Sequence, residues 1–303
     1  MMKKILIDIS GHRNQRLKSE MIDAIKTGFK LFGNYEFTLR NENIDPRDYD
    51  IVLFFYWKLS ENKFNELTEL KSLKIQTFFM SDGLFQFKNK KKCHSKYPLF
   101  ILPGGPTTVP SPSYCDRKYN TELPNDRLCL FGDELKLSPW KLDGNKVVIA
   151  HQRGISYDLK DKYKFYKKLI IDLKNKGYYT IFRVHPQCSC SRIRKISIEE
   201  CGANLCDEIS HSGRDTFKTD GIYASVSYGG KVSSRYIING IPSFTKESTV
   251  SDPLCGNNID IDNRITPPRE WWIRWLSYRH WTLNEFSKGS VLQFLVNNNE
   301  VRL

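Results

Sequence analysis

The sequence predicts an α/β protein built from two doubly wound, Rossmann-like domains that face a central cleft. With 303 residues the chain exceeds the usual size of a single core, so two domains of about 150 residues each are expected. Short, almost wholly apolar runs alternate with segments of helical periodicity, as in parallel sheets that are covered on both faces. This alternation occurs once before residue 136 and starts again at residue 146.

The first half of the chain contains the first series of strands and helices. Residues 3–10 (KKILIDIS) predict a short strand, and residues 19–33 (SEMIDAIKTGFKLFG) predict a helix with a glycine stop. The runs at 48–57 (DYDIVLFFYW) and 73–83 (LKIQTFFMSDG) predict two further buried strands of a parallel sheet. From Pro103 the stretch PGGPTTVPSPSYC is too rich in Pro and Gly for a regular element, so we expect an active-site loop or a connector.

The second half repeats the pattern. Strands are predicted at 146–150 (KVVIA), 178–187 (YYTIFRVHPQ), 221–227 (GIYASVS) and 240–245 (GIPSFT). A helix with apolar residues between 163 and 173 ends near Gly177, and a second helix covers 231–239. The predicted domains are 1–140 and 141–265, followed by C-terminal helices in 266–303.

Polar residues follow the predicted strands at their carboxyl ends. Those of the first half are Ser10, Gly11, His12, Arg13, Ser81 and Asp82, and those of the second half are His151, Gln152, Arg153 and His185. Open α/β sheets bind ligands outside the carboxyl ends of their strands. The sequence therefore predicts a ligand site in the cleft between the two domains.

The turn SVSYGGKVSS, residues 225–234, is the strongest single motif. Gly229 and Gly230 would let the backbone approach a ligand, and a helix starting near Lys231 would direct free N–H groups at it. This arrangement predicts a phosphate or pyrophosphate site, with Lys231, Ser233 or Ser234 in contact. The spacing matches neither GxxxxGK[ST] nor GxGxxG, and a tight strand-to-helix turn that only needs glycine is the alternative.

The charge balance favours a polyanionic partner. Forty-seven Lys and Arg against 34 Asp and Glu give a net charge of +13. Residues 83–115 contain no Asp or Glu and include the run KNKKKCHSK. This run is either a solvated lysine-rich loop or a patch that binds phosphates. If the polyanion is double-stranded DNA, we expect it to contact Arg13, Lys88, Lys90, Lys91 and Lys92.

Several segments resemble a known family. VVIAHQRG, FRVHPQ and SVSYGGKVSSRYIINGIPSF, within residues 145–255, resemble the nucleotide-sugar-binding half of GT-B glycosyltransferases, in particular capsule-type and phage-type enzymes. MSDGLFQF and WLSYRHWTLNEFSKGS are similar to segments of phage glycosyltransferases. The resemblance implies that residues 1–140 form the acceptor side, that 141–265 bind the nucleotide sugar, and that the C-terminal helices pack back onto the first domain.

The resemblance also implies the residues that bind the donor, most simply a UDP-sugar such as UDP-glucose. These are Arg153, His185, Ser227, Gly229, Gly230, Lys231, Ser233, Arg235 and Glu247. Without a catalytic metal, cationic side chains would stabilise the departing diphosphate. For an inverting reaction a carboxylate in the first domain would take the acceptor's proton; Asp82 is the first candidate, and Asp8 and His12 are the others.

Eight cysteines in a chain without an evident signal peptide predict free thiols or metal ligands. Cys188, Cys190, Cys201 and Cys206 are the candidates for a structural zinc site, and scattered free thiols are the alternative. Four tryptophans at 271, 272, 275 and 281 predict a large apolar helix face packed in a core, with a base-stacking platform as the other possibility.

Together these patterns predict a metal-independent glycosyltransferase that acts on a hydroxymethylpyrimidine in phage DNA. The alternatives are transfer to a surface or capsular glycan, and a non-catalytic nucleic-acid-binding protein. No apolar run approaches the ~20 residues that span a bilayer, so we expect a cytoplasmic protein, in the host cytoplasm if the chain is viral. A monomer is the expected oligomeric state.

Overall fold

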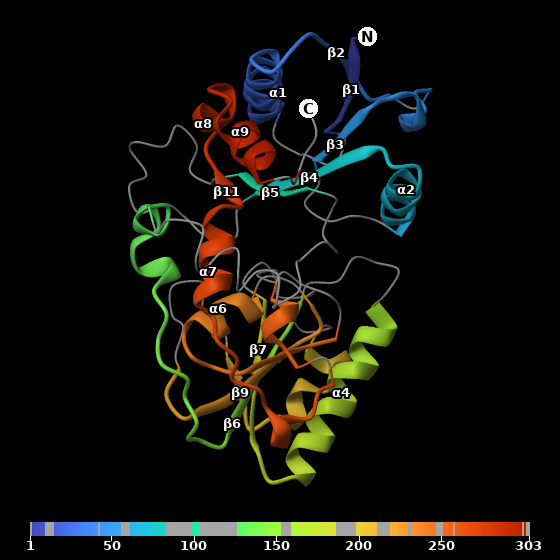
Figure 1. Ribbon diagram of the computed structural model, residues 1–303. Helices are drawn as coiled ribbons and strands as arrows, with labels where there is room; N and C mark the ends of the chain where they lie inside the picture. Colours follow the sequence, from blue (N-terminus) through green and yellow to red (C-terminus); the bar gives the residue numbers. More distant parts are fainter. Residues whose placement is uncertain are drawn as a thin grey trace. The chain divides into compact units, whose positions relative to one another are not determined.

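The computed structural model describes residues 2–9, 15–41, 43–55, 61–82, 99–103, 126–152, 159–185, 198–210, 219–229, 232–246, 251–256, 258–298 and 300. Contacts divide the chain into two compact units (Figure 1). The first unit comprises Met1–Leu135 and Glu270–Leu303, and the second comprises Lys136–Arg269. The chain therefore leaves the first unit after Leu135 and returns to it at Glu270.

The first unit contains a six-stranded sheet in the order β2-β1-β3-β4-β5-β11. Its strands are β1 (Lys3–Asp8), β2 (Tyr35–Leu39), β3 (Ile51–Phe55), β4 (Gln76–Asp82), β5 (Leu99–Pro103) and β11 (His280–Trp281). β1, β3 and β4 are parallel, as predicted, and β2, which was not predicted, is parallel to β1. β5 runs antiparallel to β4 and β11 antiparallel to β5. The prediction of a purely parallel sheet was wrong at this edge, where a late strand from the C-terminal segment completes the sheet.

Helices cover both faces of this sheet. All five residues of β3 are buried, as a near-continuous apolar strand in a doubly covered sheet should be. On one face α1 (Gln15–Lys30), α8 (Leu283–Ser287) and α9 (Ser290–Asn297) form the core with alternate residues of the strands, and α2 (Glu61–Ser72) packs against β4 (Figure 1). At Gly28 of α1 a Cβ atom would stand 2.2 Å from the Phe286 carbonyl oxygen, so glycine allows α1 and α8 to pack closely.

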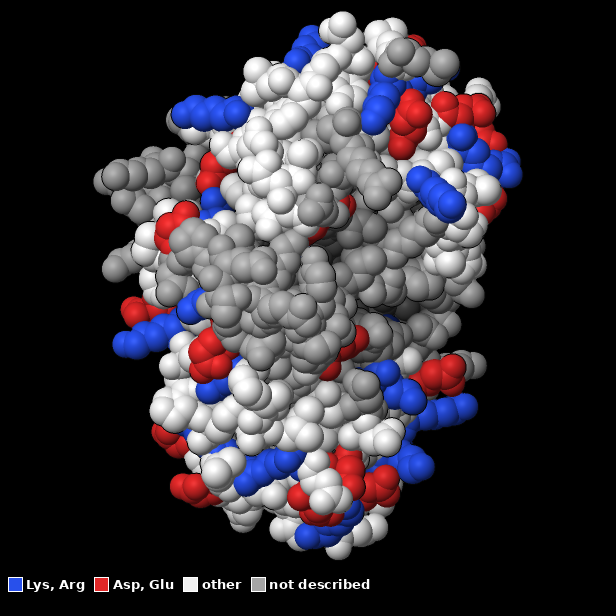
Figure 2. Space-filling model, viewed as in Figure 1, with Lys and Arg blue, Asp and Glu red and all other residues white. Residues whose placement is uncertain are grey.

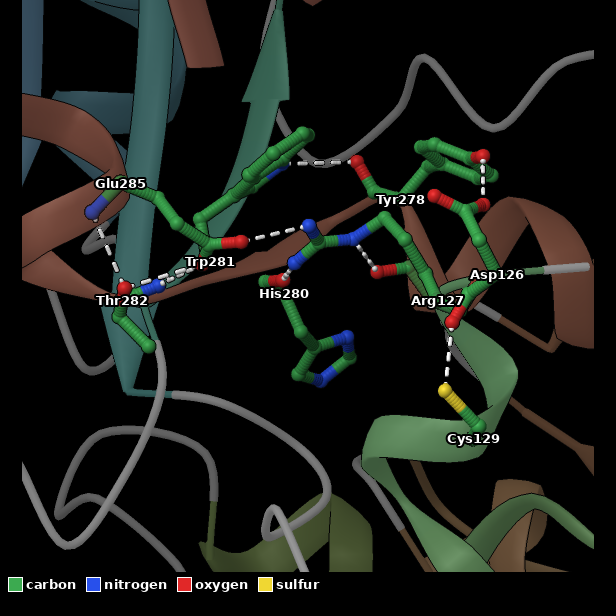
Figure 3. Close-up of polar contacts among 9 residues, drawn as sticks. Asp126, Arg127, Cys129, Tyr278, His280, Trp281, Thr282 and Glu285 are labelled. Atoms are coloured by element: carbon green, nitrogen blue, oxygen red, sulfur yellow. Dashed lines mark hydrogen bonds and ion pairs between the residues drawn. The ribbon is translucent and has the colours of Figure 1, made fainter. Parts of the chain in front are cut away.

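Arg127 joins two parts of the first unit that lie far apart in the sequence (Figure 3). Its guanidinium donates hydrogen bonds to the carbonyl oxygens of Ser277 (3.2 Å) and His280 (2.6 Å) and forms an ion pair with Glu285 (2.7 Å). The guanidinium carbon lies 3.8 Å from the centre of the Trp281 ring. This one side chain therefore satisfies the backbone at the end of α7 (Glu270–Ser277) and in β11.

All four C-terminal tryptophans are buried, with at most 4% of any of them exposed. Core packing is thus confirmed over a base-stacking platform, because a stacking platform needs exposed rings. They do not share one helix face, however. α7 ends at Ser277, and Trp281 lies in β11, where its indole N–H donates to the Tyr278 carbonyl (2.9 Å).

The second unit contains a five-stranded, all-parallel sheet in the order β8-β7-β6-β9-β10. Its strands are β6 (Lys146–Ala150), β7 (Tyr179–Arg183), β8 (Glu208–Ser210), β9 (Ile222–Ser227) and β10 (Ser243–Thr245). Numbered along this unit, the order is 3-2-1-4-5, the order of nucleotide-binding doubly wound folds. The prediction of a parallel α/β sheet is confirmed here.

Two helices cover the faces of this sheet differently. α4 (Leu159–Asn175) buries Tyr166, Leu169, Ile170 and Leu173 against one face. α6 (Val232–Ile238) lies on the other face, where small hydroxyl residues of β9 and β10 replace large apolar ones. The remaining described elements are short 3₁₀ turns at Pro46–Asp48, Leu128–Leu130, Gly132–Leu135, Ala203–Leu205, Asp252–Leu254 and Ile261–Asn263.

In the described segments, none of the helices combines the length and the apolar character needed to cross a bilayer.

Candidate functional site

The strand order of the second unit points to one place for a ligand. The chain first builds the sheet from β6 towards β8 and then places β9 and β10 on the opposite side of β6. Connections after β6 and after β9 therefore leave in opposite directions. Open parallel sheets bind their ligands outside the carboxyl ends of the two strands at such a switch point.

The last row of residues across this sheet is small or polar. Thr245, Ser227, Ala150, Arg183 and Ser210 are neighbours in register, and each is the last residue of its strand. The row before it (Phe244, Val226, Ile149, Phe182 and Ile209) is wholly apolar and faces α4. At the carboxyl edge a wholly apolar row is thus followed by a row of small or polar residues, as expected where a sheet meets a polar ligand.

Three buried polar atoms at this edge have no hydrogen-bond partner in the described part of the chain: Ser227 Oγ, His151 Nδ1 and Gln152 Oε1. Ser227 exposes 3% of its surface and His151 exposes 6%. A buried polar group without a partner costs about 1–3 kcal/mol, so a native protein retains such groups mainly where a ligand or water completes them. All three residues end or directly follow β6 or β9, the two strands at the switch point.

His151 is held in an aromatic environment. Its ring centre lies 5.8 Å from that of Tyr166 and 5.6 Å from that of Phe182, and its backbone N–H donates to the Arg183 carbonyl (2.9 Å). Burial in the first place, and the charge of nearby His185 to a smaller extent, lower the pKa of His151 to about 4. At neutral pH His151 is therefore an uncharged imidazole.

Tyr166 fixes the chain at the end of β6. This tyrosine is fully buried on α4. Its hydroxyl donates to the Ala150 carbonyl (3.2 Å) and accepts the backbone N–H of Gln152 (3.0 Å). Backbone groups just past a strand end would otherwise need another partner, so this hydroxyl holds residues 150–152 in one conformation.

A buried lysine lies beside the end of β9. Lys162, in the first turns of α4, exposes only 1% of its surface, and its ammonium lies 4.8 Å from the centre of the Tyr228 ring. Tyr228 directly follows Ser227 and packs edge-on against Phe165 at 5.4 Å. A positive charge in a low-dielectric place strengthens the attraction for an anion bound nearby.

The chain matches no known family of protein sequences, and no curated protein matches it. Solved structures with a similar chain fold include two β-Kdo transferases of KpsC from Thermosulfurimonas dismutans. The 2,4 transferase is 8% identical with a TM-score of 0.43 (93% of this chain, 97% of that chain), and the 2,7 transferase is 13% identical with a TM-score of 0.47 (96% and 100%).

A UDP-GlcNAc 2-epimerase from Methanocaldococcus jannaschii, solved with UDP-GlcNAc and UDP, is 12% identical with a TM-score of 0.30 (97% and 99%). At TM-scores below 0.5 these similarities say nothing about what this chain does. The argument for function therefore rests on the residues at the carboxyl edge.

The predicted donor residues fall into three groups. Ser227, Gly229 and His185 all lie at or just beyond strand ends of the second sheet. Ser233 is buried in α6, where its hydroxyl donates to Ser251 Oγ (3.2 Å), and Arg235 is half-buried on the same helix. Arg153, Gly230, Lys231 and Glu247 lie outside the described residues.

The sequence did not assign a binding role to two residues of this edge. His151 was expected at a strand end of the ligand site, but without a role of its own, and Lys162 was not singled out. The signal for His151 was its position directly after a buried strand. Lys162 had no such signal, because its burial follows only from how α4 packs.

The predicted catalytic and DNA-binding residues belong to the first half. Asp8 is fully buried at the end of β1 and pairs with Arg40 (3.2 Å), which also pairs with Glu66. This ion pair favours a structural role for Asp8, because a neutralised carboxylate is a poor proton acceptor. Asp82 is the last residue of β4, and the structure does not describe its side chain. His12, Arg13, Lys88, Lys90, Lys91 and Lys92 also lie outside the described residues.

Among the described residues, the face seen in Figure 2 shows Lys and Arg interspersed with Asp and Glu, without a patch of one sign. The basic run at 88–96 lies outside the residues that the structure describes. The DNA contacts therefore stay a prediction that depends on this run.

Two runs have Asp-x-Asp spacing, DYD at 48–50 in the first unit and DID at 260–262 in the second. Asp50 accepts the backbone N–H of Lys4 (2.7 Å) just before β3, and Asp262 pairs with Lys176 and accepts from Tyr178 just before β7. Within the second sheet, DID is therefore at the end opposite to the carboxyl edge of β6 and β9.

The zinc prediction gains no support. Cys201 and Cys206 are free thiols, while Cys188 and Cys190 are outside the description. The described residues contain no group of three or more His, Cys, Asp or Glu placed to hold a metal ion. Burial raises the pKa of Cys206 to about 11, and Cys201 is part of the apolar core under α4.

Proposed function

We propose that this chain is a glycosyltransferase that binds a nucleotide-sugar donor at the carboxyl edge of β6 and β9. One observation carries the proposal: buried polar atoms of Ser227, His151 and Gln152, which have no partner among the described residues, gather at the switch point of a sheet with the 3-2-1-4-5 order. The resemblance of residues 145–255 to donor-binding halves of GT-B enzymes supplies the reaction class. A UDP-sugar is the first donor to test.

The chemistry needs a stabilised leaving group and a proton acceptor. The acceptor hydroxyl attacks the anomeric carbon, the bond from that carbon to the diphosphate oxygen breaks, and the diphosphate leaves with its electron pair. Lys162 supplies a buried positive charge near the edge, and Arg153 and Lys231 are the predicted further cations. Asp82, with His12 as the second candidate, takes the proton of the acceptor hydroxyl. The reaction needs no catalytic metal.

The net charge of +13 favours a polyanionic acceptor. Hydroxymethylated DNA is the first candidate, and an acidic surface glycan is the second. Both carry the hydroxyl that the reaction requires.

The experiment crosses donors with acceptors. Purified protein is incubated with a panel of nucleotide sugars and with DNA containing cytosine, hydroxymethylcytosine or hydroxymethyluracil, and the nucleosides are analysed by mass spectrometry. A hexose or pentose mass on a hydroxymethyl base alone establishes the DNA acceptor. Release of nucleoside diphosphate without DNA modification moves the acceptor to a glycan. If every donor stays intact and unbound, the proposal is wrong.

Two serines of β9 locate the donor site. Ser225 and Ser227 face the same side of the sheet, but Ser225 Oγ shares a 2.6 Å hydrogen bond with Ser243, whereas Ser227 Oγ has no partner among the described residues. Ser227→Ala should weaken donor binding about tenfold and leave stability nearly unchanged. The control, Ser225→Ala, should cost about 1 kcal/mol of stability and leave donor binding unchanged. The reverse pattern would place the donor elsewhere.

A further inference from the structure

His151 has the form of a selective hydrogen-bonding group. It directly follows β6, exposes 6% of its surface and is enclosed by the rings of Tyr166 and Phe182. Its Nδ1 atom has no hydrogen-bond partner among the described residues, although the ring is buried. An unpartnered nitrogen in an aromatic enclosure is costly unless a ligand completes it.

We propose that His151 binds the uncharged nucleoside part of the donor through Nδ1, while the diphosphate is bound by other groups of the same edge. This inference rests on the proposed function and names the residue that recognises one part of the donor. The sequence places His151 at a strand end of the predicted ligand site, and the proposal gives it a role there.

The chemistry of the enclosure separates the two parts of the donor. A neutral imidazole offers one N–H donor and one acceptor nitrogen, which suit the hydroxyl, carbonyl and amide groups of a nucleoside. A phosphate is bound best by charged donors. Burial and the neighbouring His185 both oppose a charge on His151, so this ring is poorly suited to bind the diphosphate.

The enclosure also holds Nδ1 in place before the ligand arrives. The Tyr166 hydroxyl bonds the backbone on both sides of His151, at Ala150 and Gln152, and the His151 N–H is tied to Arg183. A group that is already oriented loses little conformational freedom on binding. Recognition through His151 therefore depends on the position of Nδ1 and not only on the presence of a polar side chain.

The test uses two substitutions that keep different ring nitrogens. The amide of His151→Asn occupies the position of Nδ1, whereas the longer amide of His151→Gln occupies that of Nε2. Wild-type protein is first titrated calorimetrically with the four common nucleosides and their diphosphates, beginning with uridine and UDP. The nucleoside and diphosphate pair that binds is then titrated into both variants.

We expect His151→Gln to raise the Kd of the nucleoside and of its diphosphate by the same factor, about tenfold, because the lost hydrogen bond is to their shared part. His151→Asn should restore both Kd values to within about threefold of the wild type. As an independent measurement, adding the nucleoside to ¹⁵N-labelled wild-type protein should shift the Nδ1 resonance of His151. This measurement needs no variant to fold.

An unchanged nucleoside Kd in His151→Gln, or a loss confined to the diphosphate, overturns the inference while the donor site itself stands. So does an unmoved Nδ1 resonance at saturating nucleoside. If none of the nucleosides or diphosphates binds the wild-type protein, the proposed function fails as well.

Discussion

Lowering the pH from 7 to 5 should destabilise the folded protein through His151, and the substitution His151→Asn should remove that part of the pH dependence. Burial lowers the pKa of folded His151 from 6.5 to about 4. Because the folded pKa is depressed, the unfolded chain takes up the proton first as the pH falls. The stabilising contribution is therefore present above pH 6.5 and is lost as the pH falls towards 4.

The size of the effect follows from the two pKa values. Linkage gives a loss of about 2 kcal/mol at pH 5 and about 3 kcal/mol at pH 4, relative to pH 7. For a domain whose total stability is about 5–15 kcal/mol, such a loss is easily measured. Other titrating groups contribute as well, but they are common to the wild type and the variant.

The assay is urea unfolding of the wild type and of His151→Asn at pH 7 and at pH 5. The fall in unfolding free energy between the two pH values should be smaller in the variant by about 2 kcal/mol. A direct check follows the His151 ring by NMR through the same range, where it should stay neutral down to about pH 4. Equal pH dependence in both proteins, or an NMR titration near pH 6.5, would refute the argument from burial.

Three further predictions concern packing and reactivity. Arg127→Met should lower the unfolding free energy, measured by urea unfolding, by about 3–5 kcal/mol, because it breaks the ion pair with Glu285 and removes the donor from two carbonyl groups. The unfolding free energy of Arg127→Lys should lie between those of the wild type and Arg127→Met. Gly28→Ala should lower the unfolding free energy by about 2 kcal/mol, because the new Cβ atom would meet the α8 backbone. The control Thr27→Ala, at an exposed position of the same helix, should be neutral or stabilising. A rise in Tm for Gly28→Ala would contradict the close approach of α1 and α8. Cys129 is exposed and should be alkylated in the native protein, whereas Cys255, whose burial raises its pKa, should react only after unfolding, as peptide mass spectrometry can show.

Local patterns were sufficient for most of the secondary structure. The run IVLFF at 51–55 could be assigned to a doubly covered strand because all its side chains need burial, and α4 could be placed from its apolar spacing and the stop near Gly177. β5 and β11 could not be predicted. Leu99–Pro103 adjoins a stretch rich in Pro and Gly, and a strand of two residues has no periodicity to recognise.

The candidate site was predictable in position but not in detail. Polar residues after apolar strands identified His151 and His185, because the carboxyl ends of parallel strands share one edge. Ser227 came from the resemblance to donor-binding halves of GT-B enzymes. Burial of Lys162 could not be foreseen, since helix spacing does not show which charged residue meets an aromatic ring from another element. The same holds for Ser233, whose hydroxyl is used by Ser251.

By itself the sequence determined where strands and helices alternate and which residues stand at strand ends, because both depend on neighbours a few positions apart. The tertiary structure alone decided the strand order of the second unit, which sets Ser227 of β9 beside Ala150 of β6 across 77 positions of sequence. It also decided which polar atoms are left without a partner, since Ser225 meets Ser243 while Ser227 meets no described group. Strand pairing and burial are relations between distant residues, and a ligand site made from unpartnered atoms exists only once those relations are formed.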